Sequence, residues 1–184
     1  MNLLDKQLIF IDLDDTLIKT VSGCQFPVNI TDMQFNIHAV EALQNLAYHN
    51  KLKAICIVSN QGGIEKGYLL ESDFRVKLEA VRSMLERTVS MICLKPIAVY
   101  AVYCTSNNAN CPDRKPNTRM LSNLQAKLAD EQIIDTHLPK HAMLMVGDAS
   151  GKPGDFSDSD AKTAENYGID YLDVDDFIKA MKHV

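Results

Sequence analysis

The feature that most constrains this chain of 184 residues is a short apolar run that ends in a cluster of acids. Residues 8–11 have the composition of a strand buried on both faces, and Asp12, Asp14 and Asp15 follow directly. An ionised carboxylate resists leaving water, so acids at the end of a buried strand need a partner. Mg²⁺ suits them because hard cations prefer oxygen ligands, and ligands of open α/β sheets bind outside the carboxyl ends of the strands. The octet 10–17 therefore indicates a metal-assisted carboxylate site; the alternative is a strand followed by an acidic turn.

The rest of the chain alternates short apolar runs with amphipathic segments. Strands are expected at 8–11, 54–58, 97–103, 142–146 and 169–172, and helices at 36–50, 71–91, 117–129, 158–167 and 175–183. This alternation predicts an α/β fold, a three-layer α/β/α sandwich around a mostly parallel sheet with right-handed crossovers. The first connection leaves room for a small flap at about 17–35 but not for a cap domain. We predict one capless domain over residues 1–184.

Composition and charge exclude several classes of protein. A net charge of -5 argues against coating nucleic acid through positive charge alone, although a local basic groove remains compatible with it. The five cysteines are too scattered for a small disulfide-rich secreted domain, and the first six residues lack the basic-then-apolar pattern of a signal peptide. No apolar run is long enough to span a bilayer. We expect a cytoplasmic protein in a reducing compartment, with no membrane partner.

Matching polar side chains recur where the later strands end. Ser59 follows the second strand, Asp148 follows the fourth, and Lys115 lies in a turn before a helix. If the strands are parallel, these residues share one edge with Asp12 and Asp14. One carboxylate can attack phosphorus while a second protonates the leaving oxygen and then activates water. A hydroxyl, an ammonium and a cation can hold the charged phosphoryl oxygens, so the set contains the parts of a phosphoryl-transfer site.

These motifs make the chain resemble the haloacid dehalogenase (HAD) superfamily of phosphatases over nearly its whole length. The first motif of the family matches residues 12–16, Asp-Leu-Asp-Asp-Thr. The second matches Ser59, the third Lys115, and the fourth residues 147–148, Gly-Asp. The resemblance implies a Rossmann-like fold and a reaction through an aspartyl phosphate.

The resemblance also assigns roles to single residues. Asp12 is implied to be the nucleophile and Asp14 the general acid/base, with Ser59 and Lys115 completing the catalytic set. Mg²⁺ is implied to bind Asp12, Asp14 through its backbone carbonyl, and Asp148. Three more residues are candidates for contact with the substrate: Thr16, Asn60 and Arg114.

Longer segments narrow the resemblance. Residues 59–67, Ser-Asn-Gln-Gly-Gly-Ile-Glu-Lys-Gly, and the Arg-Lys-Pro turn at 114–116 look like those of polynucleotide 3′-phosphatases and of histidinol- and heptose-bisphosphate phosphatases. The tail 146–169 looks like a polynucleotide kinase 3′-phosphatase domain, because the small-molecule phosphatases usually have a shorter loop there. The resemblance implies a phosphomonoester substrate at a 3′-phosphorylated DNA or RNA end, as in DNA repair.

Two alternatives stay open. One is a phosphatase of a small metabolite, such as a sugar, nucleotide or histidinol phosphate. The other is a non-catalytic member that binds phosphate or a protein. An uncapped site would admit a polynucleotide end or a small ester, and Tyr68 and Phe26 are candidate stacking residues beside ordinary packing roles. Local positive potential is expected from a set of basic residues: Lys66, Arg75, Lys77, Arg114, Lys115 and Arg119.

Some features limit these expectations. Gly151-Lys152 is followed by Pro153 and lacks the hydroxyl residue of a kinase phosphate-binding loop, so no kinase domain is expected in this chain. Cys104 and Cys111 lie where related metabolite phosphatases often bind zinc, but two cysteines cannot close a four-coordinate site.

The acids outside the motifs are less defined. Asp155 and Asp158 either support the metal through water or form the acidic start of a helix. Asp15 is left outside the catalytic set, since it either orients its neighbours or faces water.

Overall fold

The central sheet is built around the strand that precedes the acid cluster. The computed structural model describes residues 1–184 except 25–26, 28, 30, 50, 94 and 183–184, so Phe26 lies outside the described residues. The sheet has five parallel strands in the order β5-β4-β1-β6-β7. Their bounds are β1 (Leu8–Ile11), β4 (Ala54–Asn60), β5 (Ala98–Cys104), β6 (Met143–Gly147) and β7 (Asp170–Asp173). The predicted mostly parallel α/β sheet is confirmed.

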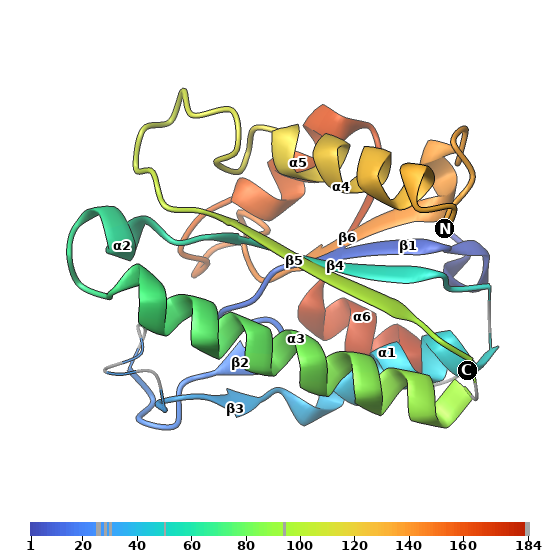
Figure 1. Ribbon diagram of the computed structural model, residues 1–184, viewed down its shortest axis with the longest axis horizontal. Coiled ribbons are helices and arrows are strands. Elements are labelled where there is room, and N and C mark those ends of the chain that lie inside the picture. The colour runs from blue at the N-terminus through green and yellow to red at the C-terminus, as the bar shows by residue number, and fades with distance from the viewer. Residues whose placement is uncertain (25–26, 28, 30, 50, 94, 183–184) are drawn as a thin grey trace.

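Helices cover both faces of this sheet (Figure 1). On one face lie α1 (Ile37–His49), α3 (Glu71–Cys93) and α6 (Val174–Met181), and on the other lie α4 (Arg119–Asp130) and α5 (Ser159–Tyr167). Successive side chains of a strand point to opposite faces, so Ile9 and Ile11 enter the core under α1 and α3 while Leu8 and Phe10 enter the core under α4. This two-sided burial is why β1 contains only large apolar residues.

Short elements complete the chain. They are η1 (Leu3–Asp5), β2 (Ile18–Lys19), β3 (Gln34–Phe35), α2 (Gly62–Glu65) and η2 (Lys140–Ala142). In the described part of the segment between β1 and α1, the regular structure is the antiparallel pair β2–β3, where a flap was expected. The helix expected from residue 117 begins at Arg119 instead, because the Asn117 N–H donates to the Arg114 carbonyl at 2.8 Å and closes a turn there.

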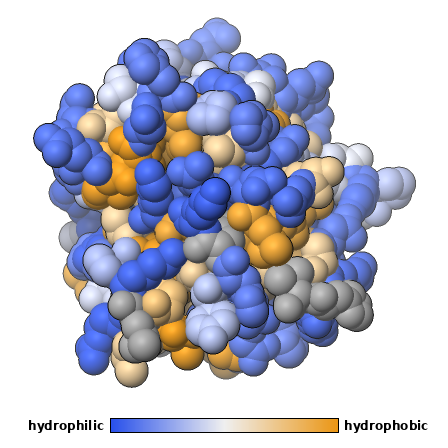
Figure 2. Space-filling model, turned by 90° about the vertical axis from the view of Figure 1, so that its right-hand side faces the viewer, coloured by the Kyte–Doolittle hydropathy of each residue, from blue (hydrophilic) through white to orange (hydrophobic). Residues whose placement is uncertain are grey.

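The two edges of the sheet differ in character. The carboxyl ends of the strands lie at the left of Figure 1, with α2 and the loops that follow β5 and β6. The opposite edge, where the strands begin, shows hydrophobic patches divided by hydrophilic side chains (Figure 2). None of the helices in the described part of the chain combines the length and the apolar run that crossing a bilayer would require.

Candidate active site

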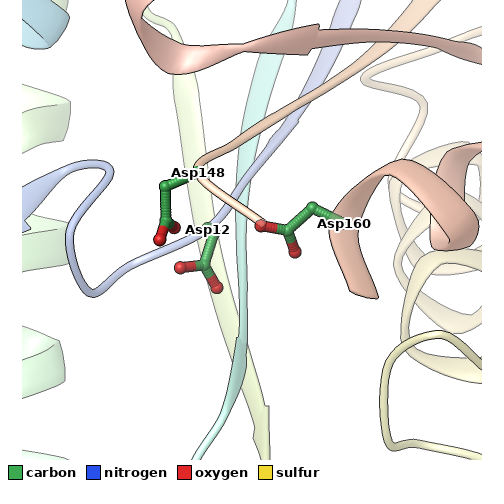
Figure 3. Close-up of side chains that lie close together, drawn as sticks. All are labelled: Asp12, Asp148 and Asp160. Atoms are coloured by element: carbon green, nitrogen blue, oxygen red, sulfur yellow. The ribbon is translucent and has the colours of Figure 1, made fainter. Parts of the chain in front are cut away.

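Three carboxylates from separate elements converge at the carboxyl edge of the sheet. Asp12 directly follows β1, Asp148 directly follows β6, and Asp160 lies in the first turn of α5; their side chains point toward one another (Figure 3). One oxygen from each lies within 4.8 Å of the others. The Asp12 N–H donates to the Val146 carbonyl at 2.9 Å, which continues the β1–β6 pairing by one residue. Strand pairing therefore fixes the spacing of Asp12 and Asp148.

A buried ammonium lies against two of these carboxylates. The side chain of Lys115 donates to Asp12 and, at 2.7 Å, to Asp160 Oδ1, and only 3% of the residue is exposed. Asn60, at the end of β4, fixes the backbone of this lysine. Its Oδ1 accepts from the Lys115 N–H and its Nδ2 donates to the Lys115 carbonyl, both at 2.9 Å. Asn60, a predicted substrate contact, is thus occupied in holding the loop that carries Lys115.

The cluster has more negative than positive charge. Burial raises the pKa of Asp12 well above its usual range, with Asp160 and Asp148 adding to the effect and Lys115 opposing it. Burial likewise raises the pKa of Asp148 to about 6, against a stabilising hydrogen bond from Thr16. Burial alone would lower the pKa of Lys115, but Asp12 and Asp160 outweigh it and the pKa is raised. One ammonium faces this cluster of three carboxylates and contacts two of them, Asp12 and Asp160.

These residues fit a divalent cation. The donors are all carboxylate oxygens, which hard cations such as Mg²⁺ prefer. Burial and the neighbouring carboxylates raise the pKa of Asp12 and of Asp148, and the positive charge of a bound cation would favour their ionised forms. Asp12 is 8% exposed and Asp148 is partly exposed, whereas Asp160 is 1% exposed and both of its oxygens are occupied, one by Lys115 and the other by the Ala149 N–H. The first two are therefore the better placed ligands.

Asp160 is the member of this cluster that the sequence reasoning missed. Its Oδ1 accepts from Lys115 and its Oδ2 from the Ala149 N–H at 3.2 Å. A Cβ on Gly147 would lie 2.1 Å from Asp160 Oδ2, so only glycine allows this close approach. A signal existed, because Asp160 shares the buried face of α5 with Thr163 and Ala164. An acid on an otherwise small and apolar helix face is unusual unless it is paired.

Asp155 and Asp158, which the sequence offered as supports for the metal, have other partners. Asp155 accepts hydrogen bonds from the Ser150 hydroxyl at 2.5 Å and from backbone N–H groups of the same loop. Asp158 pairs with Lys162 at 2.6 Å on the surface of α5. Both have local partners, so they shape the loop between β6 and α5.

Asp14 occupies a separate, partly exposed position beside the cluster. Its carboxylate accepts from Gln61 Nε2 at 2.6 Å and from the ammonium of Lys77 at 3.3 Å. Gln61 Nε2 also donates to the hydroxyl oxygen of Ser59 at 2.8 Å, which brings Asp14 and Ser59 together through one amide. Lys77 comes from α3 and is 4% exposed, although the sequence suggested only a source of surface potential.

The remaining predicted residues divide between the site and its supports. The Thr16 hydroxyl donates to Asp148 Oδ1 at 2.9 Å, and Arg114 donates to the Ser106 carbonyl at 2.8 Å. Asp15 has a φ of 56°, in the left-handed region that aspartate tolerates better than most residues. This turn directs Asp15 outward while it leaves Thr16 buried. The arrangement as a whole can place a nucleophile, a proton donor, a cation and a fixed ammonium around one phosphoryl group.

Comparisons with known proteins agree with this chemistry. A family model described as polynucleotide kinase 3 phosphatase matches residues 7–178. The bifunctional polynucleotide phosphatase/kinase of Schizosaccharomyces pombe is 32% identical over 166 residues, which cover 90% of this chain and 36% of that protein. The chain thus spans about a third of the length of this relative. The probable D-glycero-D-manno-heptose-1,7-bisphosphate 7-phosphatase of Thermoplasma volcanium is 30% identical over 152 residues, covering 81% of this chain and 90% of that protein.

Solved structures share the fold at low sequence identity. A crystal structure described as a HAD-like phosphatase from Mesorhizobium loti superposes with a TM-score of 0.60 and 18% identity, covering 97% of this chain and 87% of that chain. D,D-heptose 1.7-bisphosphate phosphatase from B. bronchiseptica, complexed with magnesium and phosphate, gives a TM-score of 0.56 and 15% identity, covering 96% and 97%. At such identities the likeness concerns the fold.

Proposed function

Because the chain belongs to the polynucleotide kinase 3 phosphatase family of HAD-type phosphatases, we propose that it removes 3′-phosphates from polynucleotide ends in a Mg²⁺-dependent reaction. The observation that carries the proposal is the convergence of Asp12, Asp148 and Lys115 at one edge of the sheet. A nucleophilic carboxylate, a metal-ligating carboxylate and a buried ammonium are the groups that transfer of a phosphoryl group requires.

In this mechanism Asp12 attacks the phosphorus and the ester bond to the leaving oxygen breaks. Asp14 donates a proton to that oxygen, then takes one from the water that hydrolyses the aspartyl phosphate. Lys115 and the Ser59 hydroxyl bind the equatorial phosphoryl oxygens, where charge gathers in the transition state. Asp160 and Asn60 position Lys115, and Gln61 holds Asp14 beside Ser59.

Mg²⁺ would be held by Asp12, Asp148 and the backbone carbonyl of Asp14. When bound, it supplies positive charge that screens the repulsion between the Asp12 carboxylate and the phosphate. The Thr16 hydroxyl supports this arrangement, because its hydrogen bond to Asp148 Oδ1 leaves the second oxygen of that carboxylate available.

The choice of a polynucleotide end rests on the family and on the predicted absence of a cap. The family model spans nearly the whole chain, and its description names a 3 phosphatase. Tyr68, which follows α2 and is 82% exposed, is the candidate for stacking on a terminal base in this proposal. We include the single capless domain over residues 1–184 in the proposal, because an uncapped site suits a bulky substrate.

The second candidate is a phosphatase of a small metabolite. It is favoured by the relative from Thermoplasma volcanium, whose name gives a heptose bisphosphate as substrate and of which this chain covers 90%. Both candidates use the same catalytic groups and differ only in what surrounds the ester.

The chemistry is tested with Asp12→Asn, which keeps the shape of the side chain and removes its charge. We expect hydrolysis of p-nitrophenyl phosphate with Mg²⁺ to fall by ~10³-fold or more while the circular dichroism spectrum is unchanged. Asp130→Asn, on the exposed end of α4, is the matched control and keeps full activity. Wild-type rates in Asp12→Asn would exclude the aspartyl-phosphate mechanism.

The substrate is tested by comparing kcat/KM for a 3′-phosphorylated oligonucleotide with a panel of sugar, nucleotide and histidinol phosphates. The proposal expects the oligonucleotide to be preferred, and a higher value for a metabolite would select the second candidate. If the wild-type protein hydrolysed no phosphomonoester with Mg²⁺ present, a binding role without catalysis would replace both.

A further inference from the structure

Two cysteines lie in contact beside the loop that delivers Lys115. Cys104 is the last residue of β5 and is 5% exposed, and Cys111 lies in the following loop, where it is partly exposed. Their Sγ atoms are 3.6 Å apart. Both are free thiols. A disulfide has an S–S length of about 2.05 Å, so the two sulfurs need to approach by only about 1.5 Å.

The two thiols have different surroundings. The N–H of Asp113, the Cys104 thiol and the N–H of Arg114 lower the pKa of Cys111, which favours its thiolate. Burial raises the pKa of Cys104, despite an opposing backbone hydrogen bond from Ser106. An accessible thiolate next to a buried thiol matches the pairing of a reactive cysteine with a resolving cysteine.

We propose that Cys104 and Cys111 are a redox modification site, at which hydrogen peroxide oxidises the two thiols to a reversible disulfide. The Cys111 thiolate attacks one peroxide oxygen, the O–O bond breaks, and a sulfenic acid and hydroxide result. The Cys104 sulfur then attacks the Cys111 sulfur, the S–O bond breaks, and a second hydroxide leaves. The two thiols lose two electrons and two protons in total, and peroxide is reduced to two molecules of water.

The disulfide would act on the loop because one of its ends is fixed. Cys104 is paired with Asn60 in the sheet, and its carbonyl accepts from the Gln61 N–H at 2.7 Å. Closing the bond therefore moves Cys111 toward the strand. The Cys111 carbonyl organises the turn before the catalytic lysine, since it accepts from the Arg114 N–H at 3.0 Å and from Asn117 Nδ2 at 2.9 Å.

The turn at 111–114 leads directly into Lys115, which is held both at its backbone and at its ammonium. Its ammonium lies between Asp12 and Asp160, and its backbone is fixed to Asn60 on both sides. A displacement of about 1 Å at a catalytic group can reduce a rate by up to ~100-fold. We therefore expect the oxidised protein to be ~10-fold less active than the reduced protein, and a thiol reductant to restore it.

Disulfide formation is tested on the full chain without reference to activity. The protein is treated with hydrogen peroxide, its remaining thiols are alkylated with iodoacetamide, and it is digested with trypsin. Lys95 precedes a proline and is not cleaved, so the peptide 88–114 carries Cys93, Cys104 and Cys111. In the wild type we expect the mass of this peptide to fall by two hydrogens and only Cys93 to be alkylated. In the Cys111→Ser variant we expect Cys104 to be alkylated after the same treatment. Alkylation of Cys104 and Cys111 after treatment, or a sulfinic acid on Cys111, would overturn the proposal.

Control of activity is tested with the same samples. Wild-type protein should lose and regain its phosphatase rate with oxidation and reduction. Cys111→Ser should not respond, and Cys24→Ser, which removes an exposed thiol outside the pair, should respond as wild type does. An oxidised protein with full activity would refute the control of Lys115. The peptide assay still decides whether the disulfide forms if the proposed phosphatase function fails.

Discussion

Lys6 and Lys115 are buried lysines at opposite edges of the same sheet, and their partners differ in kind. Lys6, before β1, donates to the carbonyls of His141 and Met143 at 2.7 and 3.0 Å and to the half-exposed Asp170. Lys115, beyond the carboxyl ends of the strands, lies between two carboxylates, of which Asp160 is fully buried.

The difference separates a lysine that supports the fold from one that the proposed reaction would use. Backbone carbonyls are fixed and neutral, so Lys6 satisfies acceptors that the fold would otherwise bury without partners. Carboxylates can change charge and exchange partners, so in the proposed reaction the ammonium of Lys115 turns from Asp12 to an incoming phosphoryl oxygen. The same residue type therefore stabilises the fold at one edge of the sheet and serves proposed chemistry at the other.

The largest effect is expected when the lysine at the carboxyl edge loses its charge. Lys115→Met should lower kcat/KM for a phosphomonoester by ~10³-fold, because it removes a fixed positive charge from the transition state. Steady-state kinetics with Mg²⁺ measures the loss, and Lys127→Met, at an exposed position of α4, is the control. A reduction below tenfold would mean that the two lysines do not differ in function.

A smaller effect, on stability instead of activity, is expected at the amino edge. Lys6→Met should lower the free energy of unfolding by about 3 kcal/mol, because the His141 and Met143 carbonyls lose a buried donor. Urea denaturation measures the change, and the folded fraction should keep the wild-type kcat. A loss of kcat comparable to that of Lys115→Met would break the comparison.

The smallest effect concerns pH and metal at the carboxyl edge. Asp148 has a pKa of about 6 in the folded protein against 3.8 in the unfolded chain, so between these values the folded state binds more protons. Stability without metal should therefore fall as pH rises through this window, by on the order of 2 kcal/mol. Denaturation in EDTA at about pH 4.5 and about pH 7.5 tests this, since the loss begins above the unfolded pKa and is complete only above the folded pKa.

Two comparisons sharpen this last prediction. Asp148→Asn cannot titrate, so its stability should depend less on pH than that of the wild type, although Asp12 contributes in the same direction. Mg²⁺ at neutral pH should stabilise the wild type more than Asp148→Asn. Equal pH dependence of stability in the two proteins would show that Asp148 does not have a raised pKa in the folded state.

Most of the fold could be predicted because each strand carries its own signal. The run at 8–11 is β1 as predicted, and the expected strands at 54–58 and 142–146 differ from β4 and β6 only at their ends. The errors lie where turns and very short elements interrupt the periodic pattern. The start of α4 is set by a turn that joins residues 114 and 117, and α2 is too short to have a periodic pattern.

The sequence by itself determined the order of the strands along the chain and the acids and hydroxyl that follow them, because apolar runs and motifs are local properties. Only the tertiary structure decided which side chains meet. It paired Lys115 with Asp160, 45 positions away, and brought Lys77 from α3 to Asp14. It also placed Lys6 among two backbone carbonyls and a half-exposed carboxylate, and Lys115 between two buried carboxylates. Burial and charge at a point depend on every element packed around it, and sequence spacing does not record them.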